Sequence, residues 1–178
     1  MTAAEVIQII ESGAQQYFHG LIQEMRSNLG TSHYRRLSNE ELSRRATVVY
    51  RNLERWIAGP DSSVVRSEGE ELGKRRFEEG IPLGQVVLAL ILEENYLRKY
   101  LSDQGVPSEG EWADTISEFF QKMIYNTARG YEVALAQSNR LAQGAVTPAG
   151  KPPAREQVPQ PEDDMEISRG GAIGEVAG

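Results

Sequence analysis

Residues 76–92 read RFEEGIPLGQVVLALIL: a charged segment, a turn with glycine and proline, and a long apolar run. Gly80 favours the left-handed conformation that ends a helix, and Pro82 has a backbone φ suited to the first turn of the next one. The seven residues Val86–Leu92 are all apolar, which predicts a helix segment without a face exposed to water. A membrane span needs about 20 apolar residues, and charged residues from Glu93 onward end this run. We therefore expect a buried helix at the centre of a bundle.

Apolar residues at spacings of three and four predict four further helices around this one. The five expected helices span about residues 2–29, 38–58, 61–79, 82–102 and 108–141. The second is the best defined, because Ser38 and Glu41 form a capping box and Gly59-Pro60 ends the helix. Ser108 and Glu111 form a second capping box before the last helix. The fold class predicted from these patterns is an all-α helical bundle.

The third and fifth expected helices differ from the others. The third has few large apolar residues and contains Gly69 and Gly73, so we expect it to lie on the outside and to open more readily. The fifth would be about 50 Å long at 1.5 Å per residue, whereas its neighbours reach about 30 Å. Its last two or three turns should therefore project, and an exposed seam there would pair with a second copy or pass motion to a following segment.

The composition changes from Gln143 onward. Residues 143–178 hold five of the eight prolines, six glycines and no aromatic residue. Such a segment buries too little apolar surface to offset the entropy of ordering. We therefore expect a helical domain over residues 1–142 and a disordered tail over residues 143–178. The acidic and apolar stretch 161–169 is either a docking motif or simply a solvated part of that tail.

The overall charge and composition exclude several function classes. The net charge of -7 leaves no basic surface of the size that nucleic-acid binding requires. The chain has no cysteine, which excludes disulfides and thiolate sites. No helix has a basic face opposite an apolar one, and the N-terminus lacks the features of a secretory signal. We expect a cytoplasmic protein without nucleic-acid or membrane partners.

Catalytic motifs are also missing from the sequence. The two histidines, His19 and His33, do not form a zinc-binding spacing, and the patterns of phosphate loops, nucleophile elbows and dinucleotide folds do not occur. We therefore expect no enzymatic activity, no metal and no cofactor.

One polar group follows the apolar run and is the best candidate for a site. Glu94 lies three residues after Ile91 and four after Leu90, which predicts that it points into the bundle, where a carboxylate needs a partner. An arginine would supply that partner, the candidates being Arg75, Arg76 and Arg129. The expected pocket or signal relay comprises Arg76, Glu94, Asn95, Asn126, Arg129 and Tyr131. The alternative is a structural ion pair at the end of a core helix.

The sequence around Gly80-Ile81-Pro82-Leu83, with Trp56 before it, resembles the N-terminal domain of RsbRD-type proteins, over about residues 3–141. These proteins are RsbT co-antagonists of bacterial stress signalling. The resemblance implies an all-helical signal-input module with STAS-type proteins or a switch kinase as partners. In the family a STAS domain usually follows, whereas no such run of strands follows in this sequence.

The function expected on this basis is a non-enzymatic regulatory domain that acts through protein–protein contacts. Two alternatives stay open, a bundle that senses a small molecule or cofactor and a structural module that dimerises through its long C-terminal helix.

Overall fold

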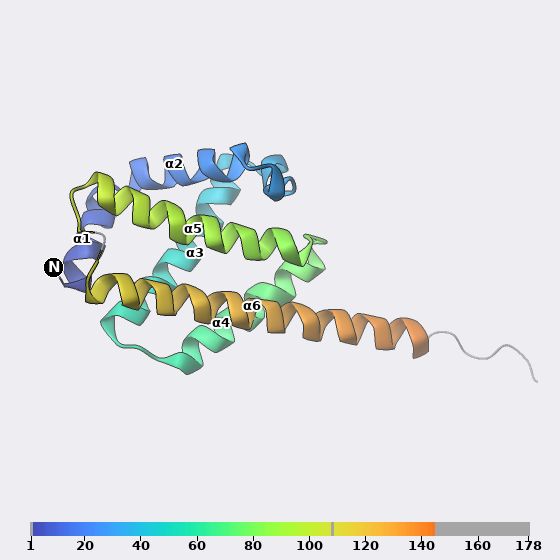
Figure 1. Ribbon diagram of the computed structural model, residues 1–178. Helices are drawn as coiled ribbons and strands as arrows, with labels where there is room; N and C mark the ends of the chain where they lie inside the picture. Colours follow the sequence, from blue (N-terminus) through green and yellow to red (C-terminus); the bar gives the residue numbers. More distant parts are fainter. Residues whose placement is uncertain (1, 108, 145–178) are drawn as a thin grey trace, which may run out of the picture. The chain divides into compact units, whose positions relative to one another are not determined.

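The computed structural model describes residues 2–107 and 109–144, and all regular structure in them is helical (Figure 1). The α-helices are α1 (Ala3–Ser12), α2 (Ala14–Ser27), α3 (Asn39–Ala58), α4 (Ser62–Glu78), α5 (Leu83–Asp103) and α6 (Glu111–Gly144), with 3-10 turns η1 (Leu29–Thr31) and η2 (Tyr34–Arg36) before α3. The predicted all-α bundle with a long C-terminal helix is confirmed. The described residues belong to one compact helical unit. The predicted tail falls, from residue 145, outside the described residues.

The prediction of one helix over residues 2–29 is wrong, because the chain breaks at Gly13 into α1 and α2. The backbone of Gly13 has φ -111° and ψ 18°, outside the helical range. A Cβ atom at Gly13 would overlap the hydroxyl group of Tyr100, and one at Gly20 would overlap that of Tyr96. Both tyrosines belong to α5, so glycine at these two positions allows α1 and α2 to pack closely against it.

The helices α4 and α5 end in the same hydrogen-bonding motif. Gly80 has φ +69°, its N–H bonds to the Phe77 carbonyl at 2.9 Å, and the Ile81 N–H bonds to the Arg76 carbonyl at 3.0 Å. Gly105, with φ +80°, makes the equivalent bonds after α5. This arrangement is a Schellman motif, which requires a residue that tolerates positive φ. The predicted helix end at Gly80 is confirmed, and Pro82 lies immediately before the first residue of α5.

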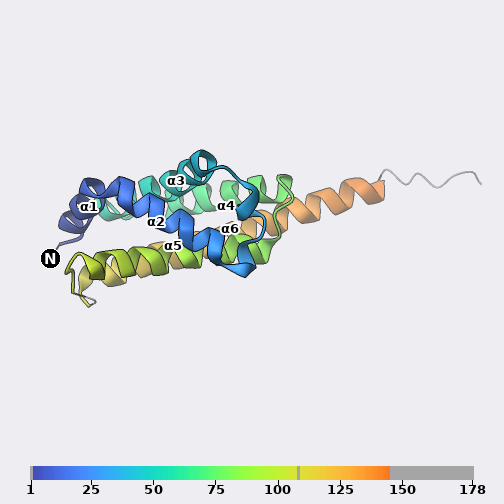
Figure 2. The ribbon, with the colours of Figure 1, turned by 90° about the horizontal axis from the view of Figure 1, so that it is seen from above.

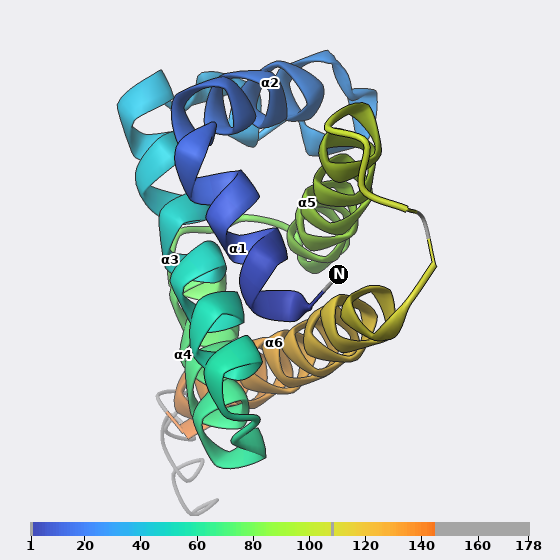
Figure 3. The same cartoon turned by 90° about the vertical axis from the view of Figure 1, so that its left-hand side faces the viewer.

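The core is formed by one face of each helix. The predicted seam of α3 is buried along its whole length, at Leu42, Ala46, Val49, Leu53 and Trp56. The helix α5 runs between α2 and α6 (Figures 1 and 3). The prediction that its apolar run has no exposed face is wrong, since Ile91 is 38% exposed.

The helices α4 and α6 touch through their backbones. A Cβ atom at Gly73 would overlap the Thr127 carbonyl, and one at Gly130 would overlap the Glu70 carbonyl. Gly69 meets the side chain of Asn126 in the same way. This contact between small residues takes the place of the large apolar side chains whose scarcity led us to expect a loosely held outer helix.

The C-terminal end of α6 extends past the ends of α4 and α5 (Figure 2). All residues from Gln137 to Gln143 are exposed, including Leu141 at 76%. The predicted projection of the last turns is therefore confirmed. At its other end α6 begins at Glu111, two residues later than a cap at Ser108 would place it, and Ser108 is outside the described residues. Nowhere in residues 2–107 and 109–144 does a helix combine the length and the apolar character that crossing a bilayer demands.

Candidate functional site

A small cavity lies between η2, α3, α4 and α5. Its volume is about 20 Å³, which is enough for one water molecule. Four of its lining residues are polar or charged, one from each of these four elements: Tyr34, Arg45, Arg76 and Glu93. The remaining wall is apolar and includes Leu42, Val49, Leu72, Val86 and Leu90.

Glu93 supplies the only carboxyl group that lines this cavity. It follows Ala89 by four residues and Leu90 by three, and because both are buried, the same face of α5 carries Glu93 into the core. Its residual exposure is 7%. Burial raises the pKa of Glu93 to about 8, and the positive charge of Arg76 offsets only part of this effect. At neutral pH the carboxyl group is therefore mainly protonated, so it can donate a hydrogen bond.

Arg76 reaches the cavity from the last turns of α4 and is 7% exposed. Its Nη1 donates to both carboxylate oxygens of Glu79, at 3.0 and 3.1 Å. Its backbone carbonyl is the acceptor in the Schellman motif that ends α4. Arg76 is therefore held at both its main chain and its side chain, between Glu79 and the cavity.

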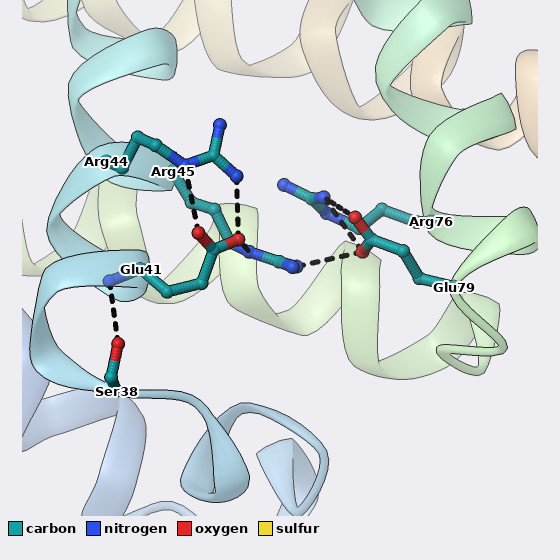
Figure 4. Close-up of polar contacts among 6 residues, drawn as sticks. All are labelled: Ser38, Glu41, Arg44, Arg45, Arg76 and Glu79. Atoms are coloured by element: carbon teal, nitrogen blue, oxygen red, sulfur yellow. Dashed lines mark hydrogen bonds and ion pairs between the residues drawn. The ribbon is translucent and has the colours of Figure 1, made fainter.

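A chain of ion pairs joins α3 to the end of α4 (Figure 4). Glu41 accepts hydrogen bonds from Arg44, at 2.7 and 2.9 Å, and from Arg45 at 2.6 Å. Arg45 in turn donates to Glu79 at 2.9 Å. Hydrogen bonds from the two arginines lower the pKa of Glu41 to about 2. The predicted capping box is half formed, because the Ser38 hydroxyl accepts from the Glu41 N–H while the Glu41 carboxylate binds arginine.

Tyr34 closes the cavity on the side of η2. It is 4% exposed, and burial raises its pKa to about 12, so its hydroxyl keeps its proton at neutral pH. With Glu93 protonated, all four polar side chains around the cavity can act as hydrogen-bond donors. The cavity is therefore suited to a small hydrogen-bond acceptor, and its volume fits one water molecule.

The six residues predicted from the sequence are separated into four places. Arg76 lines the cavity, as described above. Glu94 lies on the neighbouring face of α5, where it binds Arg98 at 3.2 Å and accepts from the Ser117 hydroxyl at 3.1 Å. Asn95 is exposed. The predicted position of Glu94 in the polar site is thus wrong by one residue, because Ile91, three residues before it, lies on the exposed side of α5.

The other three predicted residues belong to the contact between α4 and α6. Asn126 is buried against Gly69, and its Nδ2 donates to the Lys122 carbonyl at 2.7 Å. The Nη2 atom of Arg129 lies 3.8 Å from the Oε1 atom of Glu70. The ring of Tyr131 packs edge to face against that of Phe77. None of the three lines the cavity.

Sequence reasoning missed Tyr34, Arg45 and Glu93. Glu93 continues the spacing of Val86, Ala89 and Leu90 by three and four residues, but Glu94 continues the same spacing from Val87, Leu90 and Ile91, so the pattern does not separate the two carboxylates. Tyr34 had no usable signal, because it lies between the first two expected helices, and Arg45 follows Arg44 near acidic residues, a pattern common on solvated helix faces.

Comparison with known proteins found no matching family model, no matching curated protein and no matching solved structure. Within residues 2–107 and 109–144, histidine, aspartate and glutamate side chains do not gather in threes in a way that would hold a metal ion.

Proposed function

We propose that this chain is a non-enzymatic regulatory input module that acts through contacts with other proteins, as its resemblance to RsbRD-type N-terminal domains implies. The proposal includes a cytoplasmic location and a STAS-type protein or switch kinase as partner. The observation that carries it is the backbone contact between α4, which brings Arg76 to the cavity, and α6, which projects from the bundle.

In this proposal the signal passes from Arg76 along α4 to α6, and two contacts support that route. Arg76 and Glu79 occupy the end of α4, and Gly73, one turn earlier, meets the Thr127 carbonyl of α6. In the proposed relay, a change in the hydrogen-bond partners of Arg76 would shift the end of α4 relative to α3. Because backbone atoms in contact leave no room for side-chain adjustment, α6 would have to move with α4.

The two alternatives are less well supported. At the polar site, a sensor of a metabolite would need a larger space than the cavity of about 20 Å³ beside Glu93, since ligand pockets usually exceed about 300 Å³. The hollow of about 450 Å³ beside Glu70 and Arg129 is large enough, but it is more open to solvent than the cavity and contains none of the buried polar groups. A purely structural dimer would use the exposed end of α6 but would give no role to the buried polar groups.

The test is recovery of partners from cells of the source organism with the full chain and two matched variants. Leu141→Asp changes an exposed residue of the projecting end, and Ile91→Asp changes a partly exposed residue of α5. We expect a regulatory protein to be recovered with the intact chain and with Ile91→Asp, and to be lost with Leu141→Asp. If no protein were recovered and the native mass spectrum showed a bound small molecule, the chain would instead be assigned as a small-molecule sensor.

A second arm tests the relay. Arg76→Ala should change partner recovery at a temperature where circular dichroism shows the variant to be folded. Unchanged recovery in a folded variant would contradict the route through α4.

A further inference from the structure

The segment that contains η1 and η2 is a rigidly built loop. The Asn28 side chain accepts from the Gly30 N–H at 2.8 Å. The Thr31 hydroxyl, fully buried, donates to the carbonyls of Met25 and Asn28. A Cβ atom at Gly30 would overlap the side chain of Leu88, so the loop also packs tightly on α5.

Hydrogen bonds from the start of α5 hold the same loop in place. The Gln85 side chain accepts from the His33 N–H at 2.9 Å and donates to the Ser32 hydroxyl at 3.0 Å. The conformation of the loop is therefore determined by buried and interhelical contacts rather than by the solvent.

This rigid loop presents an apolar side chain to water. Leu29 is 83% exposed, the largest value among the large apolar side chains of the described residues. Its carbonyl accepts from Arg35 Nη2 at 3.3 Å, which places that arginine beside it. Arg36 follows directly and is also exposed.

The stretch of sequence that contains the loop is basic, whereas the chain as a whole is acidic. Within this stretch Arg44 and Arg45 pair with Glu41 and Glu79, while Arg35 and Arg36 belong to the loop itself. Residues 26–45 contain five arginines and two glutamates, a net charge of +3, in a chain whose net charge is -7. The net charge of all other residues is therefore -10. An exposed leucine with one arginine at its carbonyl and a second exposed arginine next in sequence matches an apolar socket edged by carboxylates.

We propose that Leu29, Arg35 and Arg36 form an interaction surface for a protein partner that presents an apolar socket edged by aspartate or glutamate. This inference rests on the proposed function, because it names the chemistry of a partner for a module that acts through protein contacts. A rigid loop loses little conformational entropy on binding, which favours it as a docking element. Nucleic acid fits less well, since phosphates would pair with the arginines but leave Leu29 in water.

The first experiment identifies what contacts the loop. A photo-crosslinking residue replaces Leu29 in the full chain, in cells of the source organism, and mass spectrometry identifies the captured peptide. We expect a peptide of another protein that combines carboxylates with apolar residues. Capture of nucleic acid, of a second copy of this chain, or of nothing would overturn the proposal.

The second experiment measures affinity for the captured protein by calorimetry. Leu29→Asp and Arg36→Glu should each weaken binding by about tenfold or more, since truncated anchors of an interface have effects of that size. Ile91→Asp, the matched control on α5, should change the affinity by less than roughly twofold, as expected outside an interface. Raising the NaCl concentration should weaken binding by the intact chain. If all variants bound the partner with equal affinity, or if binding did not depend on salt, the proposed interaction surface at Leu29 would be wrong.

The outcomes also separate this inference from the proposed function. A partner that binds Leu29→Asp normally but is lost with Leu141→Asp would overturn the loop surface and leave the regulatory role standing. Absence of any protein partner at either position would overturn both.

Discussion

At the scale of single residues, the protonation of Glu93 decides the electrostatics of the polar cavity. When the carboxyl is neutral, Arg76 is balanced by Glu79 alone. When it ionises, Arg76 faces a second carboxylate across the cavity, in addition to Glu79. The charge state of this one residue therefore sets the electrostatic balance around Arg76.

This gives a pH dependence with a definite sign. The pKa of Glu93 is about 8 in the folded chain, against an ordinary value of 4.5. Between these two values the folded state holds the extra proton, so the contribution of Glu93 to stability is full below pH 4.5 and falls as pH rises to about 8. The largest slope is about 1.4 kcal/mol per pH unit. Urea unfolding of the intact chain and of Glu93→Gln across this range should show the decline in the intact chain only.

The difference in unfolding free energy between the intact chain and Glu93→Gln isolates the effect of Glu93 from that of other titrating groups. Glu41 is one such group: its stabilising effect is lost in acid, as pH falls through its lowered pKa. Glu94→Gln is the matched control, because Glu94 precedes Arg98 by one helical turn and remains outside the cavity. If Glu93→Gln kept the same decline as the intact chain, the buried carboxyl would have to be ionised throughout.

The polar cavity was predicted from the sequence only in part. The sequence predicted that Glu94 would enter the core beside an arginine, with Arg75, Arg76 and Arg129 as candidates. The carboxyl group that enters the core near Arg76 is Glu93, whereas Glu94 pairs with Arg98. The two differ by about 100° around the helix, and adjacent acidic residues after an uninterrupted apolar run do not reveal which face is buried. The contribution of Tyr34 depends on a loop conformation that periodicity does not describe.

At the scale of elements, glycine determines how the helices fit together. From the sequence we expected Gly69 and Gly73 to weaken their helix, since glycine lowers helix propensity. In the folded chain Gly73 allows α4 to contact the Thr127 carbonyl of α6. Propensity is a local property, whereas the close approach of two helices depends on which face each glycine occupies. The sequence therefore predicted the extent of α4 but not its packing.

Gly73→Ala should destabilise the bundle by about 1–3 kcal/mol or more, because the added methyl group overlaps backbone atoms of α6 that have no freedom to move aside. Gly84→Ala is the matched control on α5, where nothing lies within 4 Å of an added Cβ atom. There the better helix propensity of alanine should leave stability unchanged or raise it by up to about 1 kcal/mol. Chemical denaturation checks both, and equal effects would show that the α4–α6 contact is looser than described.

The break between α1 and α2 gives a second prediction for packing at glycine. Gly13→Ala should be destabilising because the new methyl group meets the Tyr100 hydroxyl. Removing that hydroxyl with Tyr100→Phe should relieve part of the loss, so the double variant should be more stable than the sum of the single effects. A double-mutant cycle by thermal unfolding measures the coupling. Strict additivity would mean that Gly13 is required for the backbone geometry of the break rather than for room beside Tyr100.

At the scale of the whole helical unit, folding and partner contact use different parts of α6. Residues from Glu111 to Ala134 supply core positions such as Ile116, Phe119 and Met123, whereas residues 137–143 are exposed. The sequence anticipated this division from helix length alone, since a helix of about 34 residues is longer than its neighbours can cover. The end of α6 is therefore available for contacts without being needed for the core.

Three truncated chains separate these roles. A chain ending at Gln143 and one ending at Gln137 differ only by exposed residues, so their unfolding free energies should agree within about 0.5 kcal/mol. A chain ending at Gly130 also lacks Tyr131 and Ala134, which pack on or near α4, and should be destabilised by several times that amount. If the end of α6 carries the partner contact, the chain ending at Gln137 should melt at the same temperature as the longer one and yet lose the partner. Retention of the partner by that folded, shortened chain would place the contact elsewhere on the bundle, and the loop at Leu29 would then be the surface to test first.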